Sequence, residues 1–186
     1  MNISINKNSI TTFLLLLIAG LIIYRITPVY VPANIKVIAS KNRVSITHIH
    51  QARDIINTRV VMLDKLNLYH KGKFGHAKLG NIAKASDDFF IDVDQMISIH
   101  RAGNYQFLIG SDDGFSLTID GKRVCEHVRD RPYSVQSCNV FLNPGQHRFQ
   151  VSYFQGFGQS GFSVQYQTLD GKVYWFGENS PDLTLN

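Results

Sequence analysis

The sequence predicts a mainly β protein, an antiparallel β-sandwich that follows a single hydrophobic segment near the N-terminus. From residue 89 onward apolar and polar residues alternate with period two, as in Phe115, Leu117 and Ile119 with Ser116 and Thr118 between them. Asx-Gly and Pro-Gly pairs separate these runs, and such pairs form tight turns because glycine takes positive φ at little cost. The runs recur about every 8–12 residues, which is typical of a sandwich or barrel.

The composition agrees with this fold class. The chain has 186 residues, which suits one domain with an accessory segment. Tyr and Phe are plentiful while Met and Trp are scarce. Because aromatic residues are enriched in strands, this mixture favours a β fold over a helical one.

The hydrophobic segment Ile10–Ile26 predicts a transmembrane anchor. As a helix it spans roughly 26 Å, slightly less than a hydrocarbon core of ~30 Å, and Tyr24 and Arg25 can extend into the interface. The alternative is a signal peptide cleaved after Ala33, in the small-residue sequence 31–33. The anchor is favoured because a long stretch containing Arg25 separates the apolar run from Ala33. Both interpretations place the C-terminal domain in the periplasm or outside the cell.

The segment that precedes the sandwich is the best helix candidate. Between Thr47 and Leu66 apolar residues recur at three- or four-residue spacing, and Ser45 or Thr47 offers an N-cap. The alternative is a strand over Thr58–Leu63.

Together these patterns predict the organisation of the whole chain. The expected strands are 89–93, 96–100, 105–110, 115–119, 123–128, 135–142, 148–154, 162–168 and 173–176. The expected parts are an N-terminal tail (1–9), the anchor (10–26), a linker (27–45), a neck, possibly helical (46–68), the sandwich (69–178) and a C-terminal tail (179–186).

The two cysteines, Cys125 and Cys138, lie on consecutive expected strands. An exported location permits a disulfide between them, and closing a loop of about 14 residues contributes ~3 kcal/mol in the loop-entropy model. The alternative is a pair of buried free thiols. No CxxC or Cys/His cluster indicates a zinc site or a redox motif.

The charge distribution excludes some functions and suggests another. Residues 34–80 carry nine Lys and Arg against two Asp, whereas residues 81–186 carry eight against twelve Asp and Glu. No basic stripe with interleaved aromatics is present, so nucleic acid is not an expected partner. The basic residues Lys36, Lys41 and Arg43 suit anionic lipid headgroups, or they form an ordinary solvated surface.

Nothing in the sequence indicates catalysis. No nucleophile elbow accompanies a Ser/His/Asp set, and His48 and His50 lack a third metal ligand. We therefore expect a protein that is not an enzyme.

The most informative motif is Ser111-Asp112-Asp113-Gly114, two adjacent carboxylates between two strands. Such a pair either caps a turn or binds a hard cation. Ca²⁺ takes six to eight oxygen ligands and accepts carboxylates readily, whereas a turn needs one Asp to accept backbone N–H bonds. Both interpretations remain open.

Several spaced motifs resemble the PA14 (PA-fourteen) domain family, named after the N-terminal β-sandwich of the anthrax protective antigen. The motifs are Gly103-x-Tyr105-x-Phe107, Ser111-Asp112-Asp113-Gly114, Leu117-x-Ile119-Asp120-Gly121, Leu142-x-x-Gly145-x-His147 and Val151-x-Tyr153. The resemblance covers roughly residues 69–178. It implies a β-sandwich that often recognises carbohydrate.

The resemblance also implies a site. In lectin members two successive Asp residues joined by a cis peptide coordinate Ca²⁺, and these match Asp112 and Asp113. A later loop usually supplies an Asn, but the loop 155–161 has none. Gln155 or Gln159 can offer a carbonyl oxygen instead, and Phe157 is placed to stack on a sugar, whereas Phe154 and Phe162 are expected in the core.

Two functions follow as hypotheses. The first is a membrane-anchored module for Ca²⁺-assisted carbohydrate recognition in adhesion or surface contact. The second is a non-catalytic assembly subunit of an envelope complex that uses the sandwich to contact a protein partner.

Overall fold

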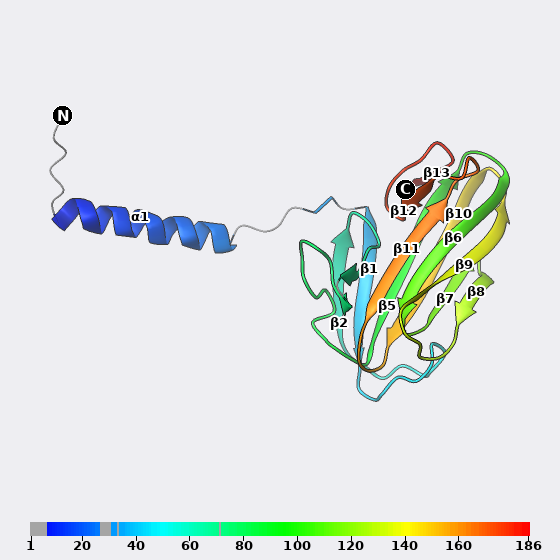
Figure 1. Cartoon of the computed structure of the whole chain (residues 1–186), viewed down its shortest axis with the longest axis horizontal. Helices are drawn as coiled ribbons and strands as arrows, with labels where there is room; N and C mark the ends of the chain where they lie inside the picture. The colour runs from blue at the N-terminus through cyan, green and yellow to red at the C-terminus, as the bar shows by residue number, and fades with distance from the viewer. Residues whose placement is uncertain (1–6, 27–30, 33, 71) are drawn as a thin grey trace. The chain divides into compact units, whose positions relative to one another are not determined.

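The computed structural model describes residues 7–26, 31–32, 34–70 and 72–186, in two compact units that divide at residue 30 (Figure 1). Residues 1–6, 27–30, 33 and 71 lie outside the described part. The predicted tail 1–9 and linker 27–45 therefore fall partly outside it, including Pro28 and Ala33.

The first unit contains the helix α1, Lys7–Ile26, which starts three residues before the predicted anchor. Its apolar window has a mean hydropathy of 2.1, and none of its residues is buried. Length and composition therefore allow α1 to cross a membrane, although a signal sequence shares both properties.

The second unit is a sandwich of two main antiparallel sheets, as the alternation predicts. The strands of the large sheet are, in spatial order, β2 (Ile55–Leu63), β1 (Ile35–Asn42), β5 (Phe89–Ile99), β10 (Gly145–Gln155), β7 (Phe115–Ile119) and β8 (Lys122–His127), with β13 (Leu183–Leu185) also paired to β5. Those of the small sheet are β12 (Val173–Trp175), β11 (Gly161–Gln167), β6 (Gly103–Asp112) and β9 (Ser134–Leu142). A short hairpin joins β3 (Tyr69–His70) to β4 (Lys73–Phe74).

The core lies between the two sheets and consists of the inward half of each alternating run. Tyr105, Phe107 and Ile109 of β6 are fully buried, and Phe107 packs 5.2 Å from Phe149 of β10 between ring centroids. The β7–β8 turn has Asp120 at φ 52° and Gly121 at φ 75°, the left-handed pair that a two-residue hairpin requires. The pattern and the turn chemistry thus led to the correct fold class.

The prediction of a linker is wrong for residues 35–42, and the neck is not helical, whereas the alternative of a strand over Thr58–Leu63 is confirmed. The segment 35–42 is β1, which pairs with the first half of β5, and residues 55–63 form β2 on its outer side. Ile35 and Leu63 face each other in this pairing and are fully buried. The helix-like spacing of apolar residues between Thr47 and Leu66 does not produce a helix. Burial on the edge of a sheet outweighs a weak local preference. The sandwich therefore begins near residue 35.

Two further boundaries differ from the prediction. The expected strands 89–93 and 96–100 are one continuous strand, β5, which pairs with β10 along its full length. The expected C-terminal tail contains β13, which pairs with the second half of β5 on the edge that β1 leaves free. Three residues are too few for a recognisable alternation, so no local pattern predicts β13.

The predicted disulfide between Cys125 and Cys138 is present. Cys125 lies on β8 and Cys138 on β9, the last strands of the large and small sheets respectively. The bond therefore joins the two layers of the sandwich along one side, rather than two paired strands within one sheet.

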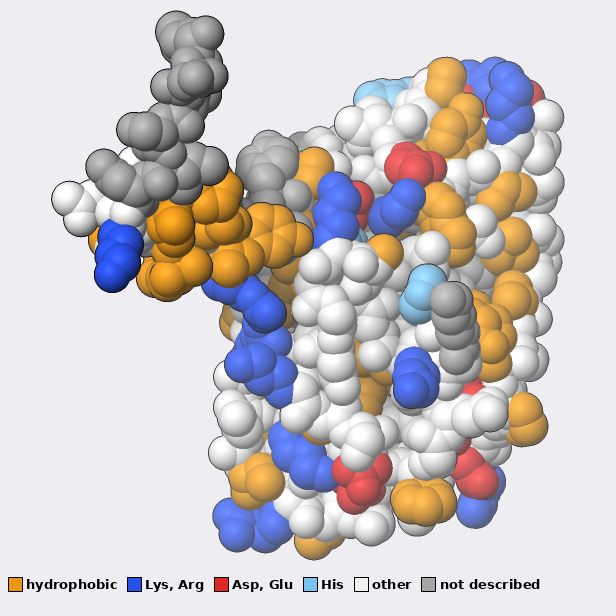
Figure 2. Space-filling view, turned by 60° about the vertical axis from the view of Figure 1, so that its left-hand side comes forward, with side chains coloured by type: hydrophobic (Ala, Val, Ile, Leu, Met, Phe, Trp, Pro, Cys, Tyr) orange, Lys and Arg blue, Asp and Glu red, His pale blue; other side chains and the backbone are white. Residues whose placement is uncertain are grey.

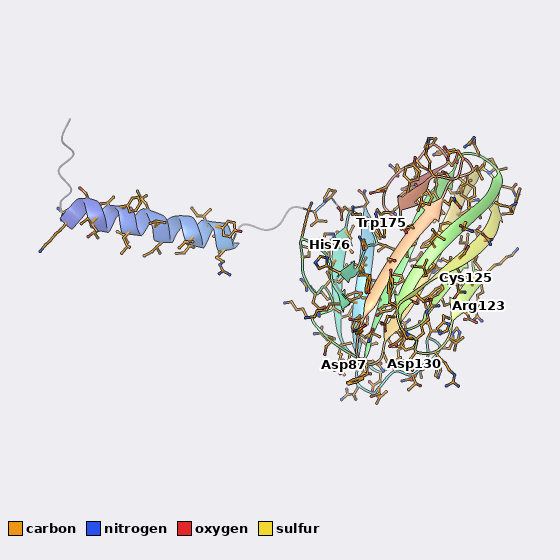
Figure 3. All side chains as sticks on the ribbon, viewed as in Figure 1. His76, Asp87, Arg123, Cys125, Asp130 and Trp175 are labelled. Atoms are coloured by element: carbon orange, nitrogen blue, oxygen red, sulfur yellow. A yellow bond between two sulfur atoms is a disulfide. The ribbon has the colours of Figure 1, made fainter. Side chains whose placement is uncertain are left out.

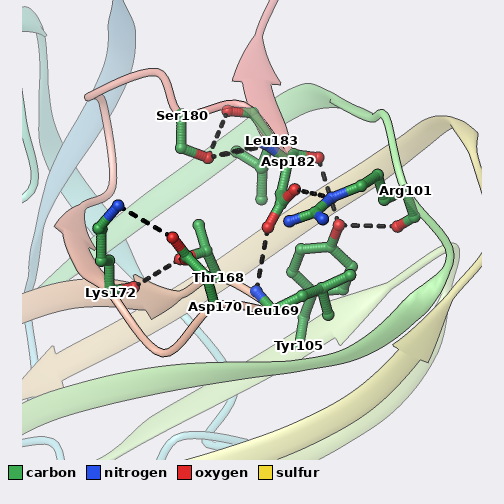
Figure 4. A network of polar contacts seen from close by, with 9 residues as sticks. All are labelled: Arg101, Tyr105, Thr168, Leu169, Asp170, Lys172, Ser180, Asp182 and Leu183. Carbon is green, nitrogen blue, oxygen red and sulfur yellow. Dashed lines mark hydrogen bonds and ion pairs between the residues drawn. The ribbon is translucent and has the colours of Figure 1, made fainter.

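A polar network fixes the C-terminal segment to the end of the sandwich (Figure 4). The buried carboxylate of Asp182 accepts hydrogen bonds from the Arg101 guanidinium and, at 3.0 Å, from the Leu169 backbone N–H. The hydroxyl of Tyr105 donates to the Arg101 carbonyl at 2.8 Å. The hydrogen bond from Arg101 lowers the pKa of Asp182, which keeps the carboxylate charged despite its burial.

We predict that Asp182→Ala lowers the free energy of unfolding by about 2 kcal/mol, because a buried N–H and a guanidinium lose their acceptor. Thermal unfolding followed by circular dichroism measures the loss. The matched control is Asp170→Ala, which removes an exposed carboxylate bound to Lys172 at 3.0 Å in the neighbouring turn. An equal loss in both variants would contradict the role assigned to Asp182.

Candidate ligand-binding site

The registers of the strands bring the acidic turn and several loops to one end of the sandwich. Asp112, at the end of β6, pairs with Gly161 at the start of β11, and Ser111 pairs with Ser134 at the start of β9. Tyr153, near the end of β10, pairs with Phe115. The turn 112–114 therefore lies among the loops 128–133 and 156–160, at the end where Figure 3 labels Asp87 and Asp130.

The peptide bond between Asp112 and Asp113 is cis, as the family resemblance implies. Both side chains are nearly inaccessible, with 6% of Asp112 and 4% of Asp113 exposed. Each uses Oδ2 to accept a backbone N–H from a different loop, from Tyr133 to Asp112 at 3.1 Å and from Gly156 to Asp113 at 2.7 Å. The two carboxylates thus hold the loops on either side of the turn.

The negative charge of the pair is incompletely compensated. Burial raises the pKa of Asp113 to about 6, the Gly156 hydrogen bond lowers it, and the charge of Asp112 raises it again. Burial also raises the pKa of Asp112, against the Tyr133 hydrogen bond and the positive charge of Arg131. The Arg131 guanidinium donates to the Ser111 hydroxyl at 2.8 Å, so it supports the Asp112 side of the pair. A cation at Asp113 would relieve the remaining cost of burying two charges.

Tyr153 and Gln155 connect the acidic turn to the following loop. The Tyr153 hydroxyl lies against the Asp112 carbonyl oxygen and, at 2.6 Å, against Gln155 Oε1. Gln155 is fully buried, and its Nε2 donates to the Gln159 carbonyl at 2.9 Å. Both ends of the Gln155 amide thus have protein partners, and Gln155 holds the loop in place. Its role as a ligand residue stays a prediction.

The aromatic residues in and beside the loop separate into one exposed and two buried side chains, as predicted. Phe157 is 87% exposed at the loop tip and Gln159 is exposed beside it, so both are accessible to a ligand. Phe154 and Phe162 are fully buried, as expected for core residues.

The sequence reasoning missed the segment 43–54, which packs against the acidic end. Ile46 and Ile49 form a small apolar cluster with Phe90 and Phe154. The Ile46 N–H donates to Asp88 Oδ1 at 3.0 Å, and the Asp88 N–H donates to the Gly156 carbonyl at 2.9 Å. The signal was the sequence Ser86-Asp87-Asp88, which resembles the acidic turn and holds this segment.

Glycine at position 156 is required by this packing. A Cβ there would lie 2.6 Å from the Ile46 carbonyl oxygen and 3.4 Å from Asp113 Oδ2. The close approach lets the Gly156 N–H reach Asp113 while the segment 43–54 covers the other side.

The donor set for a metal is small. Among the described residues no group of three or more His, Cys, Asp or Glu side chains could hold a metal ion. The turn offers the carboxylate oxygens of Asp112 and Asp113, and Asp130 lies close enough for its charge to raise the pKa of Asp113. This set suits an oxygen-preferring cation such as Ca²⁺ and not a zinc-type site.

The comparisons identify the class of protein that has this fold and acidic turn. A family model described as the PA14 domain matches residues 77–176, more than half of the chain. The chain belongs to the PA14 domain family, as the motifs indicated.

Solved structures of similar fold agree with the family. The PA14 domain of the MpAFP antifreeze protein has a TM-score of 0.59 at 16% identity, with 81% of this chain and 89% of that chain covered. The PA14 sugar-binding domain from an RTX adhesin has a TM-score of 0.60 at 15% identity, covering 79% and 96%. The Epithelial Adhesin 9 A domain from Candida glabrata, in complex with Galb1-3GlcNAc, has a TM-score of 0.55 at 11% identity, covering 82% and 89%. At these identities the likeness shows the fold. No curated protein sequence matches the chain.

We predict that Asp113→Asn stabilises the metal-free protein at pH 7.5. The pKa of Asp113 is raised from 3.8 to about 6, so folding disfavours its ionised form. This cost is fully present above pH ~6 and disappears as the pH falls toward ~4, with an upper limit of about 3 kcal/mol. Urea unfolding in EDTA at several pH values measures the gain, which should shrink between pH 6 and pH 4.

The control for this experiment is Asp87→Asn, an exposed carboxylate at the same end that interacts with Lys41 at 3.5 Å. We expect its effect to stay within about 1 kcal/mol at every pH. A stability gain for Asp113→Asn that is independent of pH would show that charge burial is not its cause.

Proposed function

We propose that this protein is a non-catalytic carbohydrate-binding module, displayed outside the cytoplasm on a membrane anchor and used in adhesion or surface contact. The observation that carries the proposal is the pair of adjacent buried carboxylates, Asp112 and Asp113, beside an exposed aromatic loop tip. Membership of the PA14 family and the sugar-binding neighbours support the ligand class.

In this proposal Ca²⁺ binds to the two carboxylates and holds sugar hydroxyls. Two aspartates supply negative charge for the ion. A raised pKa, as at Asp113, is expected of a buried carboxylate that binds a cation. Phe157 offers an apolar ring to the sugar, and the Gln159 amide offers a donor and an acceptor.

The proposed anchor is α1, whose composition suits a membrane span. The chain enters the sandwich at Ile35, and β1 runs from there to Asn42, whose N–H bonds the Asp88 carbonyl at 2.8 Å. Within the sandwich the acidic end thus lies one strand length, about 26 Å, from Ile35.

We predict that Ca²⁺ raises the melting temperature of the parent protein by several degrees at saturating concentration, because the ion binds only the folded state. Asp112→Asn should abolish the shift, and Asp87→Asn should retain it. Differential scanning fluorimetry from micromolar to 10 mM Ca²⁺, with EDTA as baseline, measures these shifts. The absence of any shift in the parent would contradict Ca²⁺ binding.

Glycan-array binding of the same variants extends the test to the sugar. Binding should require Ca²⁺ and should be weakened by Phe157→Ala, which changes an exposed side chain and therefore leaves the fold intact. Binding that survives both EDTA and Asp112→Asn would place the sugar elsewhere on the molecule.

A second candidate function is assembly with an envelope protein, and the open edge of β2 favours it. Among the described residues β2 pairs with β1 on one side and with no strand on the other, and Ile56, Val60 and Met62 are 51%, 53% and 41% exposed. A long apolar edge strand is a template for another strand. Lys and Arg side chains line one margin of the domain in the view of Figure 2.

If assembly is the function, a photo-crosslinking residue in place of Val60 should yield one discrete cross-linked product in intact cells, identified by mass spectrometry as an envelope protein. The control is the same residue in place of Phe141, which is 58% exposed on β9. Equal products at both positions, or none at Val60, would contradict assembly through β2.

A further inference from the structure

The outward face of the small sheet carries no charged side chain over most of its area. Between Asn104 and Gly110 of β6, and at the residues paired with them on β9 and β11, every outward position is uncharged. Trp175, which is half-buried, and Val173, which is 46% exposed, continue the face on β12. The polar residues on it are mostly amides, including Gln106, Asn139, Gln165 and Gln167.

The large sheet has the opposite character. Its outward face carries Asp92 and Asp94 of β5 and Arg148 of β10, where Arg148 Nε lies 2.8 Å from Asp94 Oδ1. Arg53 binds Asp92 at 2.6 Å. The absence of charge on the small sheet is therefore a property of that face, because the other exposed face of the same domain is covered with ion pairs.

The uncharged residues lie in rows across the strands. Trp175 pairs with Gln165, Gln165 with Leu108, and Leu108 with Ser137. Neighbouring strands are about 4.8 Å apart, so a row over four strands measures roughly 14 Å. This length suits an oligosaccharide rather than a single sugar.

Some of the hydrogen-bonding groups on this face have partners within the protein and others do not. Gln106 Nε2 donates to Asn139 Oδ1 at 3.1 Å, and Gln167 Nε2 donates to the Gly171 carbonyl at 2.8 Å. Within the described part of the chain, the Gln165 amide and the Trp175 indole N–H have no such partner. An unpaired amide and an indole N–H side by side can receive and donate bonds to hydroxyl groups.

Aromatic rings also lie on this face toward its acidic end. Tyr69 and Tyr133 stack at 3.8 Å between centroids. They occupy the space above two glycines of the sheet, since a Cβ at Gly161 would lie 2.2 Å from the Tyr69 ring and one at Gly110 would lie 2.2 Å from Tyr133 Oη. The row that contains Trp175 is thus bordered by a second aromatic surface.

We propose that this face binds a neutral glycan chain, with the Trp175 indole against the C–H face of a sugar ring and Gln165 bound to its hydroxyls. An aromatic ring has a negative face that attracts polarised C–H groups, and amides match hydroxyls as both donors and acceptors. The middle of this surface carries no charge, and at its edge Glu178, which accepts the Trp175 backbone N–H at 3.1 Å, is paired with Lys65 at 3.8 Å. Such a surface favours an uncharged polysaccharide over an anionic one, because its middle holds no cation to neutralise a carboxylate or a sulfate. The face is a second site, separate from the acidic turn and independent of Ca²⁺.

The chain contains a single tryptophan, which makes its fluorescence a direct reporter of the face. Soluble cellohexaose, xylohexaose and chitohexaose are titrated into the full chain in detergent with EDTA present, and polygalacturonate serves as the anionic comparison. At least one neutral oligosaccharide should shift the emission saturably, and polygalacturonate should not.

Two variants form a matched pair for the same titration. Gln165→Ala should weaken the affinity about tenfold, the effect of losing one or two hydrogen bonds. Gln150→Ala changes the same residue type on the outward face of the large sheet and should bind like the parent. Trp175→Phe, followed by sedimentation with the insoluble form of the responding polysaccharide, should lose binding while keeping the parent's melting temperature within a few degrees.

Three results would overturn the proposal. They are no emission shift with any neutral oligosaccharide, an equal response to polygalacturonate, and a response that disappears with Asp112→Asn. The last result assigns the glycan to the acidic turn alone. A Ca²⁺-independent response in the absence of any Ca²⁺-dependent stabilisation would support this face and contradict the proposed Ca²⁺ site, so the two proposals fail separately.

Discussion

The pairing of β10 with both β5 and β7 is the constraint on which the acidic end depends. The register that places Gln155 opposite Phe89 and Tyr153 opposite Phe115 brings the end of β10 beside the start of two other strands. From there the Tyr153 hydroxyl reaches the Asp112 carbonyl oxygen in the other sheet, and Gln155 holds the following loop. A slip of one residue would turn Tyr153 outward and separate these groups, because side chains alternate between faces.

Burial explains why the acidic turn is well defined in the metal-free molecule. Two adjacent carboxylates with almost no exposure must each find donors, and they obtain them from the backbone of loops that are distant in sequence. The same two carboxylates therefore also organise the loops on either side of the turn.

The two outward sheet faces and the acidic end of the domain differ in their charge. The outward face of the large sheet has ion pairs such as Arg53 with Asp92, and these make it a solvated surface. The acidic end concentrates negative charge that is only partly compensated. The outward face of the small sheet has neither, and amides with one indole take their place. One compact sandwich thus offers surfaces of three different chemistries.

The parts that the sequence predicted well share a local cause. The strands from residue 105 to residue 176 follow from period-two alternation, and the Asp120–Gly121 turn follows from the left-handed backbone that glycine permits. The disulfide follows from two cysteines on consecutive strands, although only the structure shows that it joins different sheets. The family motifs located the acidic pair, whereas Gln155 and Gln159 were suggested in place of a missing Asn, and the motifs carry no information on the burial of either.

By itself the sequence determined the β class, the turns, the hydrophobic N-terminal segment and the position of the two acids, because each depends on neighbouring residues. Only the tertiary structure decided that residues 35–63 belong to the large sheet and that residues 183–185 complete it. It also decided that Gln155 is buried while Phe157 is exposed. Edge strands gain their stability from partners far away in the chain, and burial depends on which loops meet at one end. Neither property is encoded in a local pattern.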